Sequence, residues 1–234
     1  MNGAPESRVP GPESCAFPIA VLASGRGSNL AALIEAREAG KLPIDVVLVA
    51  SDKADAPALR NAEAHGIPTF ALDPKTFASR RAFDEALFAN VSASGAQLVV
   101  LAGYMRVLDV AVTAQWQGRM INIHPSLLPK YRGLHTHRRV LKAGDLEHGA
   151  SVHFVSAELD GGPVIAQARI DIHPGDSEEA LAARLLAHEH RLLIGCVGAI
   201  ARGEVRECDG EVLFHGQTLA APLRLGDGGS LIPA

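Results

Sequence analysis

Two short segments of this chain carry the side chains best suited to catalysis, NIHPSLLP at residues 122–129 and LDGGP at residues 159–163. Asn122 and His124 stand two residues apart, so both side chains face one side if the strand continues. An amide can donate to an oxyanion, and a protonated imidazole can donate a stronger, charge-assisted hydrogen bond. The pair predicts stabilisation of an oxyanion. The alternative is a histidine whose ring is satisfied by the backbone at the end of a strand.

Asp160 precedes two glycines on an expected turn. A carboxylate within a few ångströms of an imidazole favours its charged form and raises its pKa. If Asp160 lies beside His124, the two residues together can tune a histidine and move a proton. Together with Asn122 they predict acyl transfer to a nitrogen, which needs no metal. The alternative is an aspartate that only forms a turn.

The segment GRGSN at residues 25–29 joins the first expected strand to the first expected helix. Its glycines permit a tight turn and a close approach of backbone N–H groups to a ligand, and the helix N-terminus favours an anion. A phosphate therefore fits this loop. The dinucleotide fingerprint is incomplete because Leu30 occupies the third glycine position, although Asp52 lies where a ribose-binding acid would fall. The alternative is a tight turn capped by Ser28 or Asn29.

Ten histidines invite a metal interpretation, with His135 and His137 as one candidate pair and His188 and His190 as the other. Neither pair has a cysteine or a carboxylate at a spacing typical of zinc. Residues two apart on a helix also point to different sides. The sequence therefore predicts no metal site.

Apolar runs alternate with helical patterns over the first 133 residues. The expected strands are 17–23, 44–50, 67–72, 97–101 and 120–123, and the expected helices are 28–39, 56–65, 80–91 and 109–116. Such alternation predicts an α/β, Rossmann-like open sheet that is mostly parallel, with helices on both faces. Ligands bind beyond the carboxyl ends of such strands. The loops 24–29, 103–106 and 122–129 should therefore meet at one edge of the sheet.

The pattern changes after residue 133. We expect a short helix over 137–143, strands over 150–155 and 164–172, a helix from Asp176 to about Ala201, and a hairpin over 205–214. Glu179 stands three residues after Asp176, which is the spacing of a capping box. The expected organisation is a disordered extension at 1–17, a single domain at 18–215, and a loose, Gly- and Leu-rich tail at 216–234.

Composition excludes several classes of protein. The formal net charge of -4 offers no basic surface for nucleic acid or for anionic membranes. No apolar run approaches the roughly 20 residues of a membrane span. Three scattered cysteines, Cys15, Cys196 and Cys208, indicate a reducing compartment and no disulfide framework. We expect a cytoplasmic protein with small-molecule partners, either a monomer or a homodimer.

The chain resembles the phosphoribosylglycinamide formyltransferase family in four segments, ASGRGSNL, LAGYMRVL, INIHPSLLPKYRGLHTHRRVLKAGDLEHGASVHFV and ELDGGPVIAQ. The resemblance extends from about Ile19 to Val205 and implies the formyltransferase fold. It also implies transfer of a formyl group from 10-formyltetrahydrofolate to the amine of 5'-phosphoribosylglycinamide, in de novo purine biosynthesis. Arg26 and Arg132 depart from the family pattern, since a proline is common at the second position.

The resemblance assigns roles to residues at matching positions. The implied catalytic residues are Asn122, His124 and Asp160. The implied contacts of phosphoribosylglycinamide are Gly27, Ser28, Asn29 and Glu189. The implied folate contacts are Arg80, Met105, Arg106, Val107, Leu108, Ser156, Ala157, Glu158 and Leu159. The implied co-substrate is 10-formyltetrahydrofolate, with no metal.

Other functions compete with this one. Methionyl-tRNA formyltransferases share the catalytic set but usually carry a G-A-A-P type stretch, where this chain has Gly133-Leu134-His135-Thr136-His137, and an added RNA-binding domain. Formyltetrahydrofolate deformylases carry an N-terminal regulatory domain, which 17 residues cannot form. A nucleotide-binding module without chemistry would use the glycine loop but not the catalytic set. A dehydrogenase would need a nicotinamide pocket, for which the sequence offers no evidence.

Overall fold

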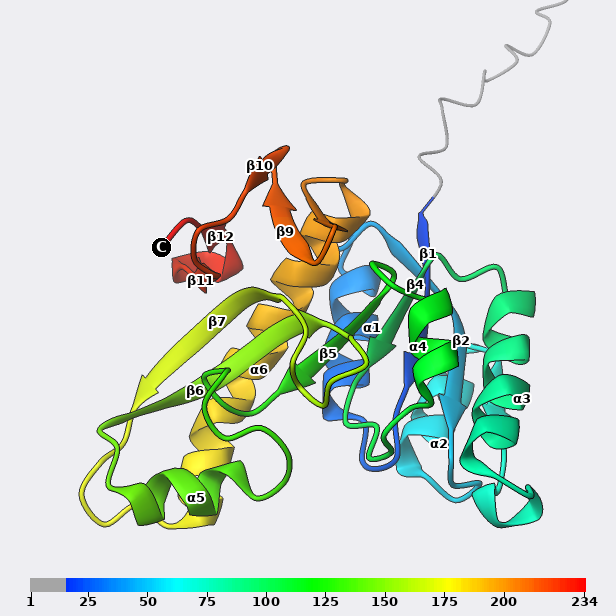
Figure 1. Ribbon diagram of the computed structural model, residues 1–234, viewed down its shortest axis with the longest axis horizontal. Coiled ribbons are helices and arrows are strands. Elements are labelled where there is room, and N and C mark those ends of the chain that lie inside the picture. Colours follow the sequence, from blue (N-terminus) through cyan, green and yellow to red (C-terminus); the bar gives the residue numbers. More distant parts are fainter. Residues whose placement is uncertain (1–15) are drawn as a thin grey trace, which may run out of the picture.

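A computed structural model describes residues 16–234 (Figure 1). The extension predicted at 1–17 therefore lies outside the described residues except for its last two, and Phe17 already begins the first strand. The strands are β1 (Phe17–Leu22), β2 (Ile44–Ser51), β3 (Thr69–Ala71), β4 (Leu98–Leu101), β5 (Met120–His124), β6 (Glu147–Phe154), β7 (Val164–Asp171), β8 (Val205–Cys208), β9 (Glu211–Phe214), β10 (Gln217–Thr218), β11 (Leu223–Leu225) and β12 (Leu231–Ile232). The helices are α1 (Ser28–Glu38), α2 (Pro57–Ala64), α3 (Arg80–Ala93), α4 (Val110–Gln115), α5 (Thr136–Ala143) and α6 (Glu178–Ala201), with short 3-10 turns η1 (Pro74–Thr76) and η2 (Asp227–Gly229).

One nine-stranded sheet organises the molecule, in the order β12-β11-β7-β6-β5-β4-β1-β2-β3. Adjacent strands are parallel in the part β5-β4-β1-β2-β3, whereas β6 is antiparallel to both β5 and β7. The predicted α/β fold with a mostly parallel sheet is confirmed. Of the antiparallel part, the sequence predicted only that two strands are joined around residues 160–162.

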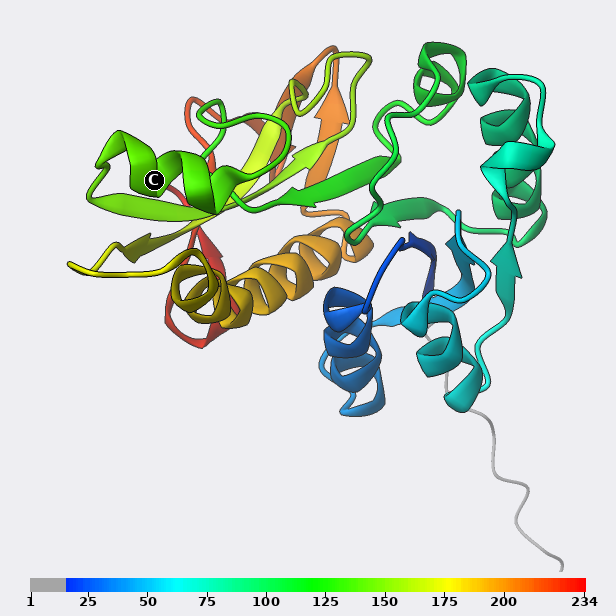
Figure 2. The ribbon, with the colours of Figure 1, turned by 90° about the horizontal axis from the view of Figure 1, so that it is seen from below.

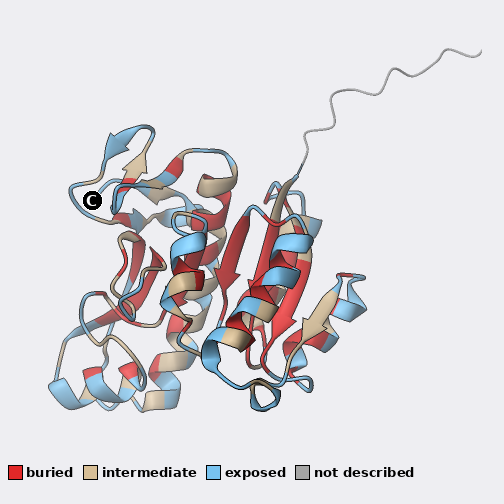
Figure 3. Ribbon diagram, turned by 45° about the vertical axis from the view of Figure 1, so that its right-hand side comes forward, coloured by how far each residue is buried: buried red, intermediate tan, exposed pale blue. Residues whose placement is uncertain are grey.

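Helices cover both faces of the sheet, with α1, α2 and α6 on one face and α3 and α4 on the other (Figure 2). Side chains alternate along β1, so that Ile19 and Val21 pack under the first layer while Ala20 and Leu22 pack under the second. This double burial explains the continuous apolar runs of the sequence. Buried residues therefore concentrate on the central strands and on the inner faces of the helices (Figure 3). None of the helices within residues 16–234 is both long enough and apolar enough to cross a membrane.

The long helix α6 begins two residues later than predicted. Ser177 is its N-cap, and its hydroxyl accepts a hydrogen bond from the backbone N–H of Ala180 at 3.1 Å. Asp176 instead accepts from the backbone N–H of His173 at 2.7 Å and pairs with Arg184. The predicted capping aspartate was therefore wrong by one residue, because a serine and an aspartate in succession are both good caps.

The C-terminal residues are ordered into the fold, in contrast to the loose tail predicted at 216–234. Within them β11 lies parallel to β7, and Leu223 is fully buried. The hairpin predicted at 205–214 is confirmed as β8 and β9, with left-handed backbone at Asp209 and Gly210. The Gly-rich sequence gives no signal for β11. This strand forms only because the tertiary fold places the edge of β7 beside it.

Candidate active site

Three loops meet beyond the carboxyl ends of β1, β4 and β5, as the sequence predicts. The loops after β1 and β4 are joined by hydrogen bonds from Ser24 N to the Gly103 carbonyl at 3.1 Å and from Met105 N to the Ser24 hydroxyl at 2.9 Å. A cavity of about 620 Å³ lies at this edge of the sheet, lined from all three loops. Residues of the β6–β7 loop and of α6 complete its wall.

The predicted catalytic residues converge on this cavity. Asn122 and His124 lie on β5, and Asp160 reaches them from the loop that connects β6 to β7. His124 Nδ1 lies 3.5 Å from Asp160 Oδ2, and Asn122 Nδ2 lies 3.5 Å from Asp160 Oδ1. All three line the cavity. The contact between His124 and Asp160, on which the sequence interpretation depends, is therefore present.

The backbone around Asp160 is unusual and holds its carboxylate in place. Asp160 has a φ of 48°, in the left-handed region, and its Oδ2 accepts a hydrogen bond from Gly133 N at 2.8 Å. A Cβ at Gly162 would overlap the Phe154 carbonyl oxygen, so this turn requires a glycine there. The side chain of Asp160 is 8% exposed. The carboxylate is thus fixed and largely withdrawn from solvent.

Burial and charge act against each other at this site. Burial lowers the pKa of His124 below its ordinary value, and this outweighs the hydrogen bond to the Tyr131 carbonyl and the charge of Asp160, which both raise it. Burial also works to raise the pKa of Asp160, but contacts with His153, with Gly133 N and with His124 hold it below its usual range. The charge of Asp160 raises the pKa of His124 as expected, but burial lowers this pKa by more. The depth of burial could not be read from the sequence.

His153 is a site residue that the sequence interpretation missed. It lies opposite Asn122 in the β5–β6 pairing, with Nε2 3.2 Å from Asn122 Nδ2 and 3.7 Å from Asp160 Oδ1. Its Nδ1 donates to the Phe154 carbonyl at 2.8 Å, which leaves Nε2 as an acceptor for the amide of Asn122. The signal was a histidine between Val152 and Phe154 in the strand that pairs with β5. His153 therefore orients Asn122, whose amide in turn contacts Asp160.

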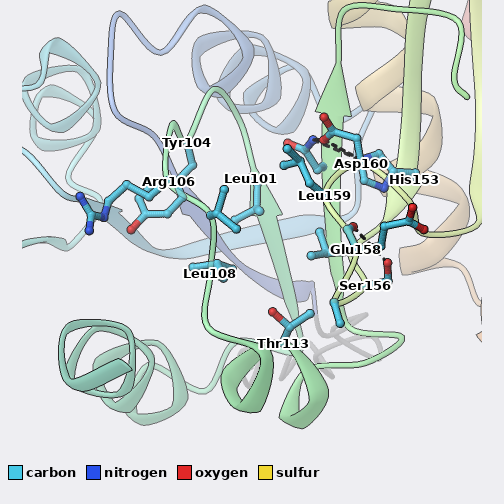
Figure 4. A pocket seen from close by; sticks show the side chains of 14 residues that line it. Leu101, Tyr104, Arg106, Leu108, Thr113, His153, Ser156, Glu158, Leu159 and Asp160 are labelled. Carbon is cyan, nitrogen blue, oxygen red and sulfur yellow. Dashed lines mark hydrogen bonds and ion pairs between the residues drawn. The ribbon is translucent and has the colours of Figure 1, made fainter. Parts of the chain in front are cut away.

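A smaller cavity of about 90 Å³ adjoins the larger one and shares Asn122 and Asp160 with it (Figure 4). Most of the predicted folate contacts line it, namely Arg106, Val107, Leu108, Ser156, Ala157, Glu158 and Leu159. Met105 lines only the larger cavity. Tyr104 and Thr113 line the smaller cavity and were not predicted. Arg80 begins α3, is exposed and lines neither cavity, so its contact with folate stays a prediction.

Gly27 is the N-cap of α1 and brings the start of this helix to the cavity. Its φ is 75°, and a Cβ there would lie 2.7 Å from the Cβ of Ala58. Ser28 and Asn29 follow as the first two residues of α1, and Asn29 lines the cavity. The backbone N–H groups of this first turn have no partner within the helix, which suits an anion.

Replacing Gly27 by alanine should lower the free energy of unfolding by about 2 to 4 kcal/mol, since the left-handed backbone and the overlap with Ala58 both oppose a side chain. Urea denaturation measures this change. Gly25→Ala is the matched control, because no atom lies within 4 Å of the Cβ that it would add. An equal loss in both variants would contradict this explanation.

Glu189 reaches the same cavity from α6. Burial raises its pKa to about 7, and a contact with the Asn29 side chain only partly offsets this effect. A carboxyl group with such a pKa is partly protonated near neutral pH. The two implied substrate contacts Asn29 and Glu189 are therefore brought together, although 160 positions separate them.

Replacing Glu189 by glutamine should stabilise the protein by between about 1 and 3 kcal/mol at pH 8. The folded-state pKa of about 7 lies above the ordinary value of 4.5, so wild-type stability falls as pH rises through this interval. The variant lacks this fall, and both proteins should converge near pH 4. Urea denaturation at both pH values measures the difference. A gap that is equal at both pH values would show that Glu189 does not titrate in this way.

The candidate metal pairs are not brought together as ligand sets. His135 is the N-cap of α5, whereas His137 Nδ1 lies 2.9 Å from His148 Nε2. His188 and His190 both lie on α6. Within residues 16–234, no group of three or more histidine, cysteine or carboxylate side chains is placed to hold a metal ion.

Comparisons with known proteins show which family this chain is similar to. The family described as formyl transferase matches residues 18–197. A phosphoribosylglycinamide formyltransferase of Escherichia coli (strain K12) is 46% identical over 201 residues, which are 86% of this chain and 95% of that protein. The trifunctional purine biosynthetic protein adenosine-3 of Drosophila melanogaster is 47% identical over 74% of this chain and 13% of its own length.

The fold is shared as well. The structure of the phosphoribosylglycinamide formyltransferase from Coxiella burnetii, in complex with CHES, superposes with a TM-score of 0.84 at 45% identity, covering 87% of this chain and 96% of that one. The matched residues include β5, the β6–β7 loop and most of α6, which supply the candidate catalytic set and Glu189. By its sequence and its fold, the chain belongs to the formyl transferase family.

Proposed function

We propose that this protein transfers a formyl group from 10-formyltetrahydrofolate to the amine of 5'-phosphoribosylglycinamide, giving the N-formyl product and tetrahydrofolate in de novo purine biosynthesis. The observation that carries the proposal is that Asn122 and His124 each lie 3.5 Å from the Asp160 carboxylate, at one cavity that all three residues line. The choice of substrates is supported by relatives that are named phosphoribosylglycinamide formyltransferases and that this chain covers over nearly their full length.

The two adjoining cavities suit two substrates. The larger one is lined by Asn29, in the first turn of α1, where a phosphate would bind, and by Glu189, which suits the polar glycinamide end. The smaller one has apolar walls from Leu101, Leu108 and Val155, which suit a flat pteridine ring. Because both cavities reach Asn122 and Asp160, an amine in one and a formyl group in the other would meet beside the catalytic residues.

The chemistry then begins with attack of the neutral amine on the formyl carbon. The formyl oxygen becomes an oxyanion, and Asn122 Nδ2 donates a hydrogen bond to it. The amine must lose a proton as the new bond forms, and ordered water passes this proton toward Asp160 and His124. The bond between the formyl carbon and the folate nitrogen then breaks, and that nitrogen takes up a proton.

The resting state of His124 fits this sequence of events. Its Nε2 lies 3.0 Å from the Tyr131 carbonyl and donates to it, so Nδ1 carries the lone pair that faces Asp160. A neutral imidazole can accept a proton, and burial keeps it neutral before the reaction. A developing oxyanion beside Nδ1 adds a second negative charge to that of Asp160. The protonated ring can then donate to the oxyanion.

The two nearest alternatives use the same three residues on another acceptor. One is transfer to charged initiator tRNA, and the other is hydrolysis of the formyl folate by water. The negative net charge disfavours tRNA, since binding nucleic acid requires a basic surface. We further propose a cytoplasmic location, which the scattered cysteines of the sequence support, and assembly as a monomer or a homodimer.

One assay separates these functions. The protein is incubated with 10-formyltetrahydrofolate together with phosphoribosylglycinamide, with charged initiator tRNA, or with no acceptor, and formylated products are followed by mass spectrometry. We expect N-formyl phosphoribosylglycinamide in the first reaction only. Formyl-methionyl-tRNA, or release of formate at an equal rate without acceptor, would overturn the proposal.

A further inference from the structure

A buried polar network lies behind the candidate catalytic histidine, formed by Ser126, Ser151 and Gln167. Ser126 and Ser151 are fully buried, and Gln167 is nearly so. Neither Ser151 nor Gln167 lines either substrate cavity. Buried polar side chains of this kind are retained when their hydrogen bonds specify one local arrangement.

We propose that Gln167 is a positioning residue for His124, which it acts on through Ser151 and the loop of residues 125–131. This inference rests on the proposed function, since it concerns the same reaction. It assigns a role in catalysis to a side chain of β7, which carries none of the predicted site residues.

The network forms hydrogen bonds with both the N–H and the carbonyl group of Leu128. Gln167 Nε2 donates to the Leu128 carbonyl at 2.8 Å and to the Ser151 hydroxyl at 3.0 Å. The Ser151 hydroxyl accepts from Leu128 N at 3.0 Å and donates to the Ser126 carbonyl at 2.7 Å. Loss of Gln167 would leave a buried carbonyl without its partner, and such a group is expensive to leave unpaired. The loop would therefore have to move or admit water.

The same loop leads directly to the ring of His124. The Ser126 hydroxyl donates to the Lys130 carbonyl at 2.7 Å, and Lys130 N donates to the Leu127 carbonyl at 3.0 Å. The next carbonyl, that of Tyr131, lies 3.0 Å from His124 Nε2. The position of this carbonyl decides which ring nitrogen carries the proton and how the ring is turned toward Asp160.

Ser151 supports the same ring from the neighbouring strand. It lies directly opposite His124 in the antiparallel pairing of β5 with β6. Gln167 in turn lies opposite Ser151 in the pairing of β6 with β7. Three adjacent strands thus present His124, Ser151 and Gln167 in one row across the sheet, and the loop after β5 folds back onto this row.

The test is Gln167→Met, which keeps the side-chain length but removes both donors. We expect kcat to fall by roughly 10- to 100-fold, while KM for each substrate stays within about twofold of wild type, because a small displacement of a catalytic group slows the chemical step. The ring nitrogens of His124 should lose the single Nε2–H tautomer in ¹⁵N NMR spectra. A residue that only stabilised the fold would leave this tautomer unchanged.

The matched control is Ile165→Val, a fully buried residue of the same strand outside the network. It should lower stability without changing kcat or the tautomer. If Gln167→Met does not fold, Ser151→Ala removes the other side chain that holds Leu128 and should show the same changes. A folded variant with wild-type kcat and tautomer would overturn the inference, as would an equal loss of kcat in Ile165→Val.

The outcomes for the two proposals can be told apart. The tautomer of His124 is measured without substrates, so it tests the network even if the wild-type protein formylates another acceptor. Failure of the wild-type protein to formylate phosphoribosylglycinamide would overturn the proposed function alone. An active wild-type protein whose Gln167→Met variant keeps both tautomer and kcat would overturn the positioning role alone.

Discussion

Asp160→Asn should keep the fold and lower kcat by roughly 10²- to 10⁴-fold, which is the range for loss of a group that moves a proton in the transition state. The asparagine oxygen can still accept from Gly133 N, as the Asp160 carboxylate does at 2.8 Å. What the variant loses is the negative charge beside His124 Nδ1, which works against burial to raise the pKa of the ring. The protonated ring that the oxyanion needs is then harder to form.

Asp176→Asn is the matched control for this variant. The side chain of Asp176 is also 8% exposed, and its carboxylate also accepts one backbone N–H, that of His173 at 2.7 Å. Neither substrate cavity contains it. It should change stability but not turnover. Rapid-quench measurement of formyl transfer in both variants is the experiment, and near-wild-type kcat in a folded Asp160→Asn protein would reject the proposed role.

The second large effect is expected for Asn122→Leu, which should lower kcat by about 10²- to 10³-fold through loss of one oxyanion donor. Leucine is similar to asparagine in size and leaves β5 in place. The interaction is made only as charge develops, so KM should change little. Steady-state kinetics with each substrate varied in turn gives both constants. A loss that fell wholly on KM would make Asn122 a binding residue instead.

Asn90→Leu serves as the control for Asn122→Leu. The amide of Asn90 donates to the Ala86 carbonyl at 3.0 Å on the exposed side of α3, outside both cavities. The double variant of Asn122 and Asp160 gives a further check. Because the two side chains contact each other and act on one transition state, their combined loss should be much smaller than the product of the single losses.

The order of elements and the edge that carries the site were predictable from the sequence. A short apolar run such as that of 97–101, with Gly95 and Gly103 on either side, is typical of a buried strand, and the alternation of such runs with helical patterns favours a parallel sheet. The carboxyl ends of parallel neighbours then share an edge. This is why the sequence alone predicts that loops separated by nearly 100 residues lie together.

Other features depend on quantities that a sequence does not carry. The pKa of His124 depends on how deeply its ring is buried, and this depth is set by the loop of residues 125–131 and by β6. The roles of His153 and of Gln167 depend on strand register, since one residue of slippage would turn either side chain to the other face. The backbone carbonyl of Tyr131 has no side-chain signature at all.

The placement of β11 beside β7 has a consequence for the behaviour of the protein at high concentration. An exposed strand edge has unpaired N–H and C=O groups, which can pair with a strand of another chain and so cause self-association into extended sheets. Here β11 pairs with the outer edge of β7 at Ala166 and Gln167, and the sheet ends with β12, which has only two residues. We therefore expect β11 and β12 to reduce aggregation through this edge of the sheet.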